Sequence, residues 1–293
     1  MPPPVAHFFH GLLMGTADSV PGVSGGTMAL IVGIYGRLLA SIGHGFRAIL
    51  SVVRFDRLAV VLHLRGVEWG LVGPLALGIG TALLIAAEFV PELLKDWPVE
   101  SRAVFLGLVA ASLAVPWRQI RDRNHRSIVI ALAAAIPAFV LSGLPPGSIV
   151  DPTPLVIFLG AAFAICAMIL PGVSGAFLLL VVGLYEPTLR AVDELDLAYL
   201  AVFAVGMVIG LGTFSLVLGG LLARSHDVTM AALVGLMAGS LRALWPWQDD
   251  ERGLLSPVDP LVPVLFVALG AAVVVGIQAV AWRRSRIDPM KRA

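Results

Sequence analysis

Charged residues are scarce in this chain of 293 residues, since Asp, Glu, Lys and Arg together make up only 13% of it. Soluble domains carry about 25% of these four residues and are about 45–50% apolar. Here 58% of the residues are hydrophobic, so a water-soluble fold would have too few charges to cover its surface. This excludes a soluble domain and predicts an integral membrane protein.

Cysteine and excess charge of one sign are scarce as well. The single cysteine, Cys166, excludes an internal disulfide and a thiolate metal cluster. The formal net charge of +1 gives no basic face of the kind that binds nucleic acid, so we expect no nucleic-acid partner. His7 and His10 have no further histidine or carboxylate nearby in the sequence to complete a metal set. We therefore predict no metal site and no cofactor.

Long apolar runs are abundant. The eight runs are about 8–40, 68–90, 102–117, 127–143, 155–189, 198–223, 228–246 and 261–282. Lengths near 20 residues suit one crossing of a hydrocarbon core of about 30 Å. The first and fifth runs exceed 30 residues, and each contains Pro-Gly near its middle, which breaks a helix. Each half is too short to span the membrane, so each long run is either a broken crossing helix or a re-entrant hairpin.

Basic residues distinguish these alternatives, because Lys and Arg collect in cytoplasmic loops. If both long runs are hairpins, fourteen basic residues lie in loops on one side of the membrane and four on the other. If both runs cross, the division is ten to eight. The count predicts a re-entrant fifth run but is silent on the first, because the tail before it has no Lys or Arg. With two hairpins, both termini are cytoplasmic.

The two long runs are copies of each other. Residues 17–35 align without gaps on residues 167–185, and ten of the 19 positions are identical, including Pro, Ser and Tyr. Weaker similarity continues between 106–113 and 234–241, at an offset of 128 instead of 150. The first copy therefore holds 22 extra residues, most simply in the Arg-rich stretch 41–66.

This repeat predicts the architecture. Each copy is one hairpin followed by three crossings, and an odd number of crossings turns the second copy upside down. We therefore expect an all-α polytopic membrane protein, a single membrane domain over 1–293, with two inverted repeats at about 8–143 and 155–282. If both long runs crossed, the copies would instead be parallel. Inverted repeats with interrupted helices are typical of secondary transporters, whose substrate site lies where the breaks meet.

The Pro-Gly breaks are the predicted substrate site. A helix that starts after a break presents free backbone N–H groups and the positive end of its dipole, which bind phosphate or carboxylate. Glycines let these N–H groups approach a ligand, and hydroxyl side chains cap the helix. The second copy is the less polar half, with Ala176 and Phe177 at two of these positions. The predicted substrate-binding residues at the breaks are Ser24, Gly25, Gly26, Thr27, Ser174 and Gly175.

Ionisable residues at membrane depth are further candidates, because a charge at the bilayer centre costs at least about 2.5 kcal/mol. Arg37 and Arg242 are candidates for binding an anionic headgroup, and Asp18 and Glu88 for carrying a coupling proton. Each occurs in one copy only, as expected if the repeat forms the frame and single substitutions set the chemistry. The alternatives are that Arg37 extends to the membrane interface and that Glu88 lies at the headgroups.

Four other glycines at repeated positions have a plainer interpretation. Gly33, Gly107, Gly183 and Gly235 lie within apolar runs, where small residues let helices pack closely. We expect that packing role for all four.

The doubled motif resembles a known family. Residues 14–27 with Gly-Ile-Tyr at 33–35, and Pro-Gly-Val-Ser-Gly at 171–175 with Gly-Leu-Tyr at 183–185, resemble the DUF368 family of bacterial and archaeal membrane proteins, described as polyprenyl-phosphate transporters. The resemblance implies a transporter, or flippase, that returns undecaprenyl phosphate, the lipid carrier of cell-wall precursors, to the cytoplasmic leaflet. It also implies the cytoplasmic membrane as location, and polyprenyl phosphate and membrane lipids as partners.

Two other functions compete with lipid transport. A small-anion channel or exchanger is the main alternative, because paired broken helices also bind chloride and carboxylates. An enclosed path would favour ions, whereas a lateral opening would favour a headgroup that crosses while its tail stays in lipid. A lipid phosphatase is weaker, since it needs a His nucleophile among Arg and Lys residues, so we expect no enzyme. The sequence leaves a homo-oligomer open.

Overall fold

The computed structural model describes residues 4–19, 24–249 and 251–287, without the side chains of residues 87, 88, 90, 91, 94 and 280–287. Within these ranges the chain is helical, and its one β pairing is an isolated bridge between Gln248 and Leu254. The helices are α1 (Pro4–Asp18), α2 (Gly25–Ile31), α3 (Tyr35–Val53), α4 (Arg57–Gly66), α5 (Trp69–Asp96), α6 (Pro98–Ser112), α7 (Ala114–Gln119), α8 (His125–Leu141), α9 (Pro154–Ile169), α10 (Gly175–Val182), α11 (Tyr185–Asp193), α12 (Leu197–Arg224), α13 (His226–Ser240), the 3-10 helix η1 (Leu241–Leu244) and α14 (Leu261–Ile287). The predicted all-α class is confirmed.

Five helical segments are long and apolar enough to cross a membrane. They are Trp69–Ala86, Pro98–Gln119, Leu197–Arg224, His226–Leu244 and Leu261–Ala279. The remaining predicted crossing, 127–143, corresponds to α8, an apolar helix of 17 residues. The chain is therefore a polytopic membrane protein, as predicted.

Several helices begin at residues suited to that position. Asp196 and Asn124 accept hydrogen bonds from backbone N–H groups in the first turns of α12 and α8. Pro98 and Pro154 stand in the first turns of α6 and α9, where a missing N–H removes no hydrogen bond within the helix. The sequence thus sets these helix starts locally.

The two long runs are more broken than predicted. One break per run was expected, but α10 and α11 are separated by a second break and bent by 103°. Gly183 ends α10 with φ +82°, and Gly33 follows α2 with φ +76°, a left-handed backbone that glycine adopts without strain. A Cβ on Gly33 would meet nothing within 4 Å, so the expected packing role is wrong there. At both positions the glycine ends a helix, and at Gly183 the predicted close packing is confirmed too, because a Cβ there would lie 2.8 Å from the Ser148 nitrogen. Pro21 and Gly22 lie outside the described residues.

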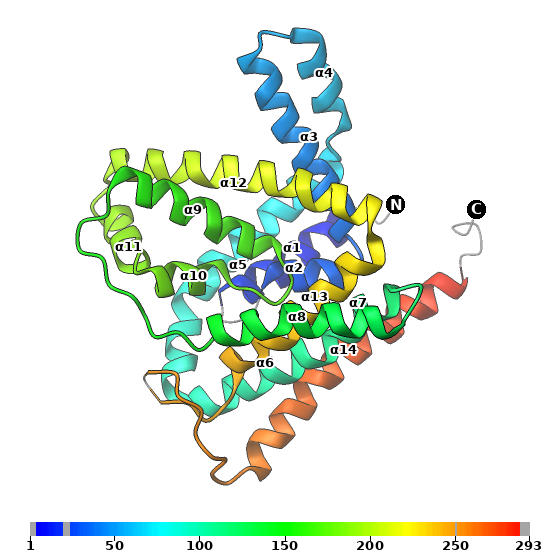
Figure 1. Ribbon diagram of the computed structural model, residues 1–293, viewed down its shortest axis with the longest axis vertical. Coiled ribbons are helices and arrows are strands. Elements are labelled where there is room, and N and C mark those ends of the chain that lie inside the picture. The colour runs from blue at the N-terminus through cyan, green and yellow to red at the C-terminus, as the bar shows by residue number, and fades with distance from the viewer. Residues whose placement is uncertain (1–3, 20–23, 250, 288–293) are drawn as a thin grey trace.

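The helices repeat at the two predicted offsets. α1 and α9 begin 150 residues apart, α5 and α12 are each 28 residues long and begin 128 residues apart, and α6 and α13 follow with 15 residues each. The copies differ where the extra residues were expected. In the first copy α3 and α4 form a hairpin that projects from the rest of the molecule, whereas α11 is a single helix of nine residues (Figure 1).

Each copy packs partly on the other. α1 lies against α5, and α9 against α12, within one copy each. The last long helices are exchanged, since α8 of the first copy packs against α13 of the second, and α14 of the second against α6 of the first. Gly107 and Gly235 lie at these contacts, where a Cβ would meet the carbonyl oxygens of Val267 and Ala131. Their predicted packing role is confirmed.

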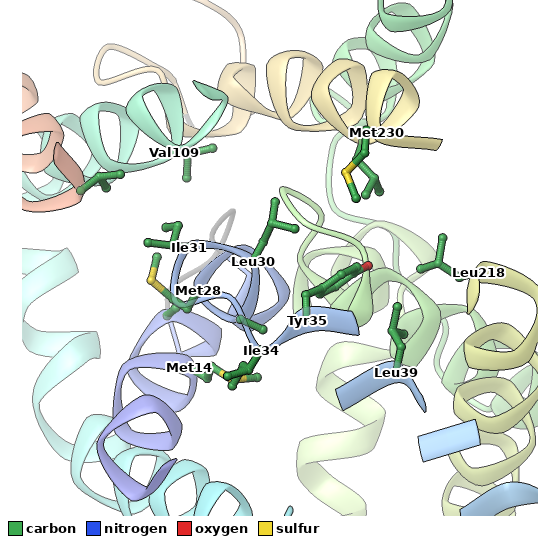
Figure 2. Close-up of a cluster of buried hydrophobic side chains, with 14 of the residues drawn as sticks. Met14, Met28, Leu30, Ile31, Ile34, Tyr35, Leu39, Val109, Leu218 and Met230 are labelled. Carbon is green, nitrogen blue, oxygen red and sulfur yellow. The ribbon is translucent and has the colours of Figure 1, made fainter. Parts of the chain in front are cut away.

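Helix α2 lies at the centre of the main apolar cluster. All seven of its residues are buried. Figure 2 shows Met28, Leu30 and Ile31 of α2 among side chains from other helices, including Val109 of α6 and Met230 of α13. The short helix of the first broken run therefore lies where the two copies meet.

Candidate functional site

The two broken motifs contact each other. The Ser24 hydroxyl lies 3.0 Å from the carbonyl oxygen of Met168 and 3.1 Å from that of Leu170, so its hydrogen is directed at the end of α9. The Thr27 hydroxyl oxygen accepts a hydrogen bond of 2.8 Å from the Gly172 N–H. Ser24 and Thr27 are both fully buried. The structure thus brings residues 24–27 of the first motif to residues 168–172 at the second, and side chains of the first bind backbone groups of the second.

Tyr35 adds a third link between the motifs. Its hydroxyl donates to the carbonyl oxygen of Ile169 at 3.2 Å, although Tyr35 follows the second break of its run. Sequence reasoning did not place Tyr35 in the site, but a signal was present, because the residue recurs as Tyr185 in the second copy. We call these contacts of Ser24, Thr27 and Tyr35 with residues 168–172 the motif junction.

The backbone N–H groups in the first turn of α2, which were predicted to bind an anion, donate to side chains of the protein itself. The Gly25 N–H donates to Asp18 Oδ1 at 2.6 Å, and the Gly26 N–H to the Ser24 hydroxyl at 3.1 Å. A carboxylate at a helix N-terminus is favoured by the helix dipole. A Cβ on Gly25 would collide with the Asp18 carboxyl group, and a Cβ on Gly26 with the Ile169 carbonyl. These two positions require glycine because other groups approach so closely.

The second motif is built with fewer polar side chains. Ser174 caps α10, where its hydroxyl oxygen accepts a hydrogen bond of 3.3 Å from the Phe177 N–H. Gly172 has φ +85° and lies against Met237 of α13, and Gly175 lies against the Ala164 carbonyl. This half of the site is less polar, as its sequence indicates.

One cavity lies beside each motif. A cavity of about 240 Å³ is lined by Leu30, Gly33 and Tyr35 of the first motif, together with Gln119 and His226. It adjoins the Arg-rich loop between α7 and α8, for which the basic-residue count predicts a cytoplasmic position. We call it the inner cavity.

A second cavity, of about 170 Å³, is lined by Gly172, Ser174 and Phe177 of the second motif, together with Ser142 and Ser240. It adjoins the ends of α8 and α13, for which the same count predicts a position on the opposite side. We call it the outer cavity. The motif junction contributes residues to the walls of both cavities.

A surface groove of about 720 Å³ runs between α6–α7 and α14. Its walls are mainly apolar, with Arg118, Gln119 and Gln278 as the polar exceptions. Gln119 also lines the inner cavity, so the groove and that cavity meet at one side chain. No sequence signal pointed to Gln119, which stands at the end of a short helix.

The predicted charged candidates lie in different places. Arg37 forms an ion pair with Glu68 at 2.5 Å, and its hydrogen bond holds the pKa of the Glu68 carboxyl below its usual range. Arg242, in η1, lies beside the last turn of α8, with its guanidinium 4.7 Å from the centre of the Phe139 ring. Asp18 lies next to the motif junction, where its carboxylate accepts a hydrogen bond from the Gly25 N–H. Glu88 lies in α5, and its side chain is outside the described part. The binding and coupling roles of all four stay predictions.

Among the described residues, no cluster of three or more His, Cys, Asp or Glu side chains forms a metal site. The rings of His7 and His10 pack in a T-shaped arrangement, with 5.7 Å between their centres.

Sequence comparisons connect this geometry to known proteins. A polyprenyl-phosphate transporter of Vibrio cholerae is 40% identical over 259 residues, which cover 88% of this chain and 83% of the relative. A polyprenyl-phosphate transporter of Staphylococcus aureus is 27% identical over 255 residues, which cover 80% of this chain and 84% of the relative. No solved structure matches the chain. The sequence profile described as undecaprenyl phosphate translocase-like matches residues 14–257, and the chain belongs to this family.

Proposed function

We propose that this protein moves polyprenyl phosphate, in particular undecaprenyl phosphate, across the cytoplasmic membrane. The lipid returns to the inner leaflet for reuse as a carrier, and both termini of the protein are cytoplasmic. The family and the names of its two relatives support a polyprenyl-phosphate substrate. The proposed direction of lipid movement, toward the inner leaflet, follows from the reuse of the lipid as a carrier there.

The observation that carries the proposal is the groove that meets the inner cavity at Gln119. A prenyl tail needs an apolar path open to lipid, and the groove has apolar walls. A phosphate headgroup needs polar partners, and Arg118 and Gln119 stand at one end of the groove. An apolar surface groove next to the inner cavity favours a lipid over a small anion in an enclosed channel.

The headgroup crosses at the motif junction in this mechanism. Hydrogen bonds from Ser24 and Tyr35 to backbone carbonyls hold the two motifs together. When these bonds break, the motifs separate and expose hydroxyl and N–H groups to the phosphate, at Ser24, Gly25, Gly26, Thr27, Ser174 and Gly175. Access then alternates between the inner and outer cavities, as expected for inverted repeats with broken helices. Asp18 and Glu88 are the proposed carriers of a coupling proton.

Reconstitution into liposomes tests the function. The leaflet movement of labelled polyprenyl phosphate should be much faster with protein than without it. Ala111→Phe narrows the groove and should slow this movement at least tenfold, because the bulky ring occupies the path of the tail. Ala201→Phe, on an exposed face of α12, is the matched control and should keep the wild-type rate. Chloride flux without lipid movement would contradict the proposal in favour of an anion channel.

Cysteine labelling tests the inverted arrangement. After replacement of Cys166, single cysteines at Asp56 and Glu194 occupy exposed turns after α3 and α11, on the segments that connect the broken run of each copy to α5 and to α12. Inverted copies predict labelling from opposite sides of the membrane. Labelling of both from one side would show parallel copies.

A further inference from the structure

We propose that Arg252 is a second guanidinium, besides Arg242, that receives the phosphate monoester headgroup at the outer cavity. This rests on the proposed function, and it names a residue that captures the lipid before its headgroup reaches the motif junction. The inference starts from the connection between η1 and α14, which brings Arg252 to the second motif.

A tight turn fixes the position of Arg252. The Asp249 carboxylate accepts a hydrogen bond of 2.6 Å from the Gly253 N–H, and the Asp249 N–H donates to the Gly253 carbonyl oxygen at 3.2 Å. Below the turn, the Leu255 N–H donates to the Trp247 carbonyl oxygen at 2.9 Å. Arg252 itself has φ +63°, a left-handed backbone that residues with a Cβ rarely adopt. Strained backbone of this kind occurs where the surrounding structure determines it, often at functional sites.

The turn places the guanidinium of Arg252 against Phe177, a residue of the outer-cavity wall. Its central carbon lies 4.2 Å from the centre of the Phe177 ring, a cation–π contact. Phe177 lines the outer cavity, and its N–H is the group that Ser174 caps. Arg252 therefore stands one side chain away from the second motif.

Arg242 forms a second guanidinium–aromatic pair near the outer cavity, whose wall includes its chain neighbour Ala243. It packs on Phe139 of α8, whose neighbour Ala138 lines the outer cavity. Its Nη1 approaches the Phe139 carbonyl oxygen at 3.4 Å, and its buried Nε has no hydrogen-bond partner within the described part of the chain. Two guanidinium–aromatic pairs thus lie next to residues of the cavity wall, one on α8 and one on α10.

The charges around these two arginines favour an anion. Among the described residues, neither Arg242 nor Arg252 forms an ion pair with a carboxylate. Burial lowers the pKa of the Arg252 guanidinium, and repulsion from Arg102 of α6 lowers it further. A phosphate monoester presents several acceptor oxygens and a double negative charge, which match two planar guanidinium groups.

Transport kinetics test the role of Arg252. Arg252→Ala should lower the initial rate of polyprenyl-phosphate movement in liposomes about tenfold at low lipid concentration, with a smaller effect at saturation. Arg252→Lys should recover only part of the rate, because an ammonium cannot form the bidentate contact. Arg190→Ala removes an exposed arginine on the same predicted side and should leave the rate unchanged. Wild-type kinetics in Arg252→Ala would overturn the inference and leave the proposed function intact.

A binding measurement separates this inference from the function and identifies the source of the phosphate. In detergent, polyprenyl phosphate should raise the thermal midpoint of the wild-type protein. Arg252→Ala should lose most of that shift while keeping the unliganded midpoint, and Phe177→Leu should lose most of it from a lower unliganded midpoint, because Phe177 is buried. Inorganic phosphate should give no comparable shift at the same concentration. An equal shift from inorganic phosphate would assign the site to free phosphate and overturn the lipid role. A shift that persists in Arg252→Ala would overturn the role of Arg252, whether or not transport is observed.

Discussion

The two broken motifs repeat one sequence pattern, but they contribute different chemical groups to the contact between them. The first contributes side chains to the junction, through Ser24, Thr27 and Tyr35. The second contributes main-chain carbonyl and N–H groups, and its own equivalents of Asp18 and Thr27 are Met168 and Phe177. The nearest positive charge to the second motif comes from another segment, since Arg252 packs on Phe177. A repeated frame can therefore hold chemically different side chains in its two copies.

The glycine at the second position of α2 gives the sharpest contrast between the copies. Gly26→Ala places a Cβ against the Ile169 carbonyl, where backbone must shift, and overpacking of this kind costs about 1–3 kcal/mol. We expect a lower thermal midpoint and more than tenfold slower lipid movement. The counterpart in the second copy is naturally alanine, so Ala176→Gly should have little effect on either measurement. Equal effects of the two substitutions would show that the motifs are equivalent.

The Thr27 hydroxyl tests whether the side chains of the first motif hold the junction. Thr27→Val keeps the shape but leaves the buried N–H of Gly172 without an acceptor, which costs about 1–3 kcal/mol. Thermal unfolding in detergent should show this loss. Thr16→Val is the control, because the exposed Thr16 hydroxyl bonds only to the Leu12 carbonyl in its own helix. A Thr27→Val protein as stable as the control would remove the junction bond from the stabilising contacts.

The carboxylate that only the first motif has can be neutralised without loss of its hydrogen bond. In Asp18→Asn an oxygen still accepts from the Gly25 N–H, so the stability should change by at most about 1 kcal/mol. If Asp18 carries the coupling proton, transport by the variant should lose its dependence on a pH gradient. An unchanged dependence would assign the coupling to another residue.

The smallest effect is expected at the ion pair between Arg37 and Glu68 in the first copy. Glu68→Gln removes a half-exposed partner of Arg37, and such pairs contribute about 0–1 kcal/mol. Because pairing lowers the folded-state pKa of Glu68, its contribution is present at neutral pH and disappears as the pH falls through that pKa. Wild type and variant should therefore differ slightly at pH 7 and converge under acid conditions. A difference that grows with acidification would contradict this pairing.

Local patterns in the sequence predicted much of the fold. Hydropathy located the crossing helices, and the doubled Pro-Gly segment located the broken runs, because both signals lie within short stretches of chain. The second break was missed at Gly33 and Gly183, since a glycine within an apolar run indicates close packing as readily as a helix end. The meeting of the motifs was expected from the repeat, but the individual partners were not.

What the sequence determined by itself is the membrane class, the internal repeat, the family and the position of the broken segments. Only the tertiary structure decided that the Ser24 hydroxyl bonds to carbonyls 144 and 146 residues away, and that Arg252 packs on Phe177. The reason is physical: apolar length and helix breaks depend on neighbouring residues in the chain, whereas the partner of a buried polar group depends on which segments the packing brings within hydrogen-bonding distance.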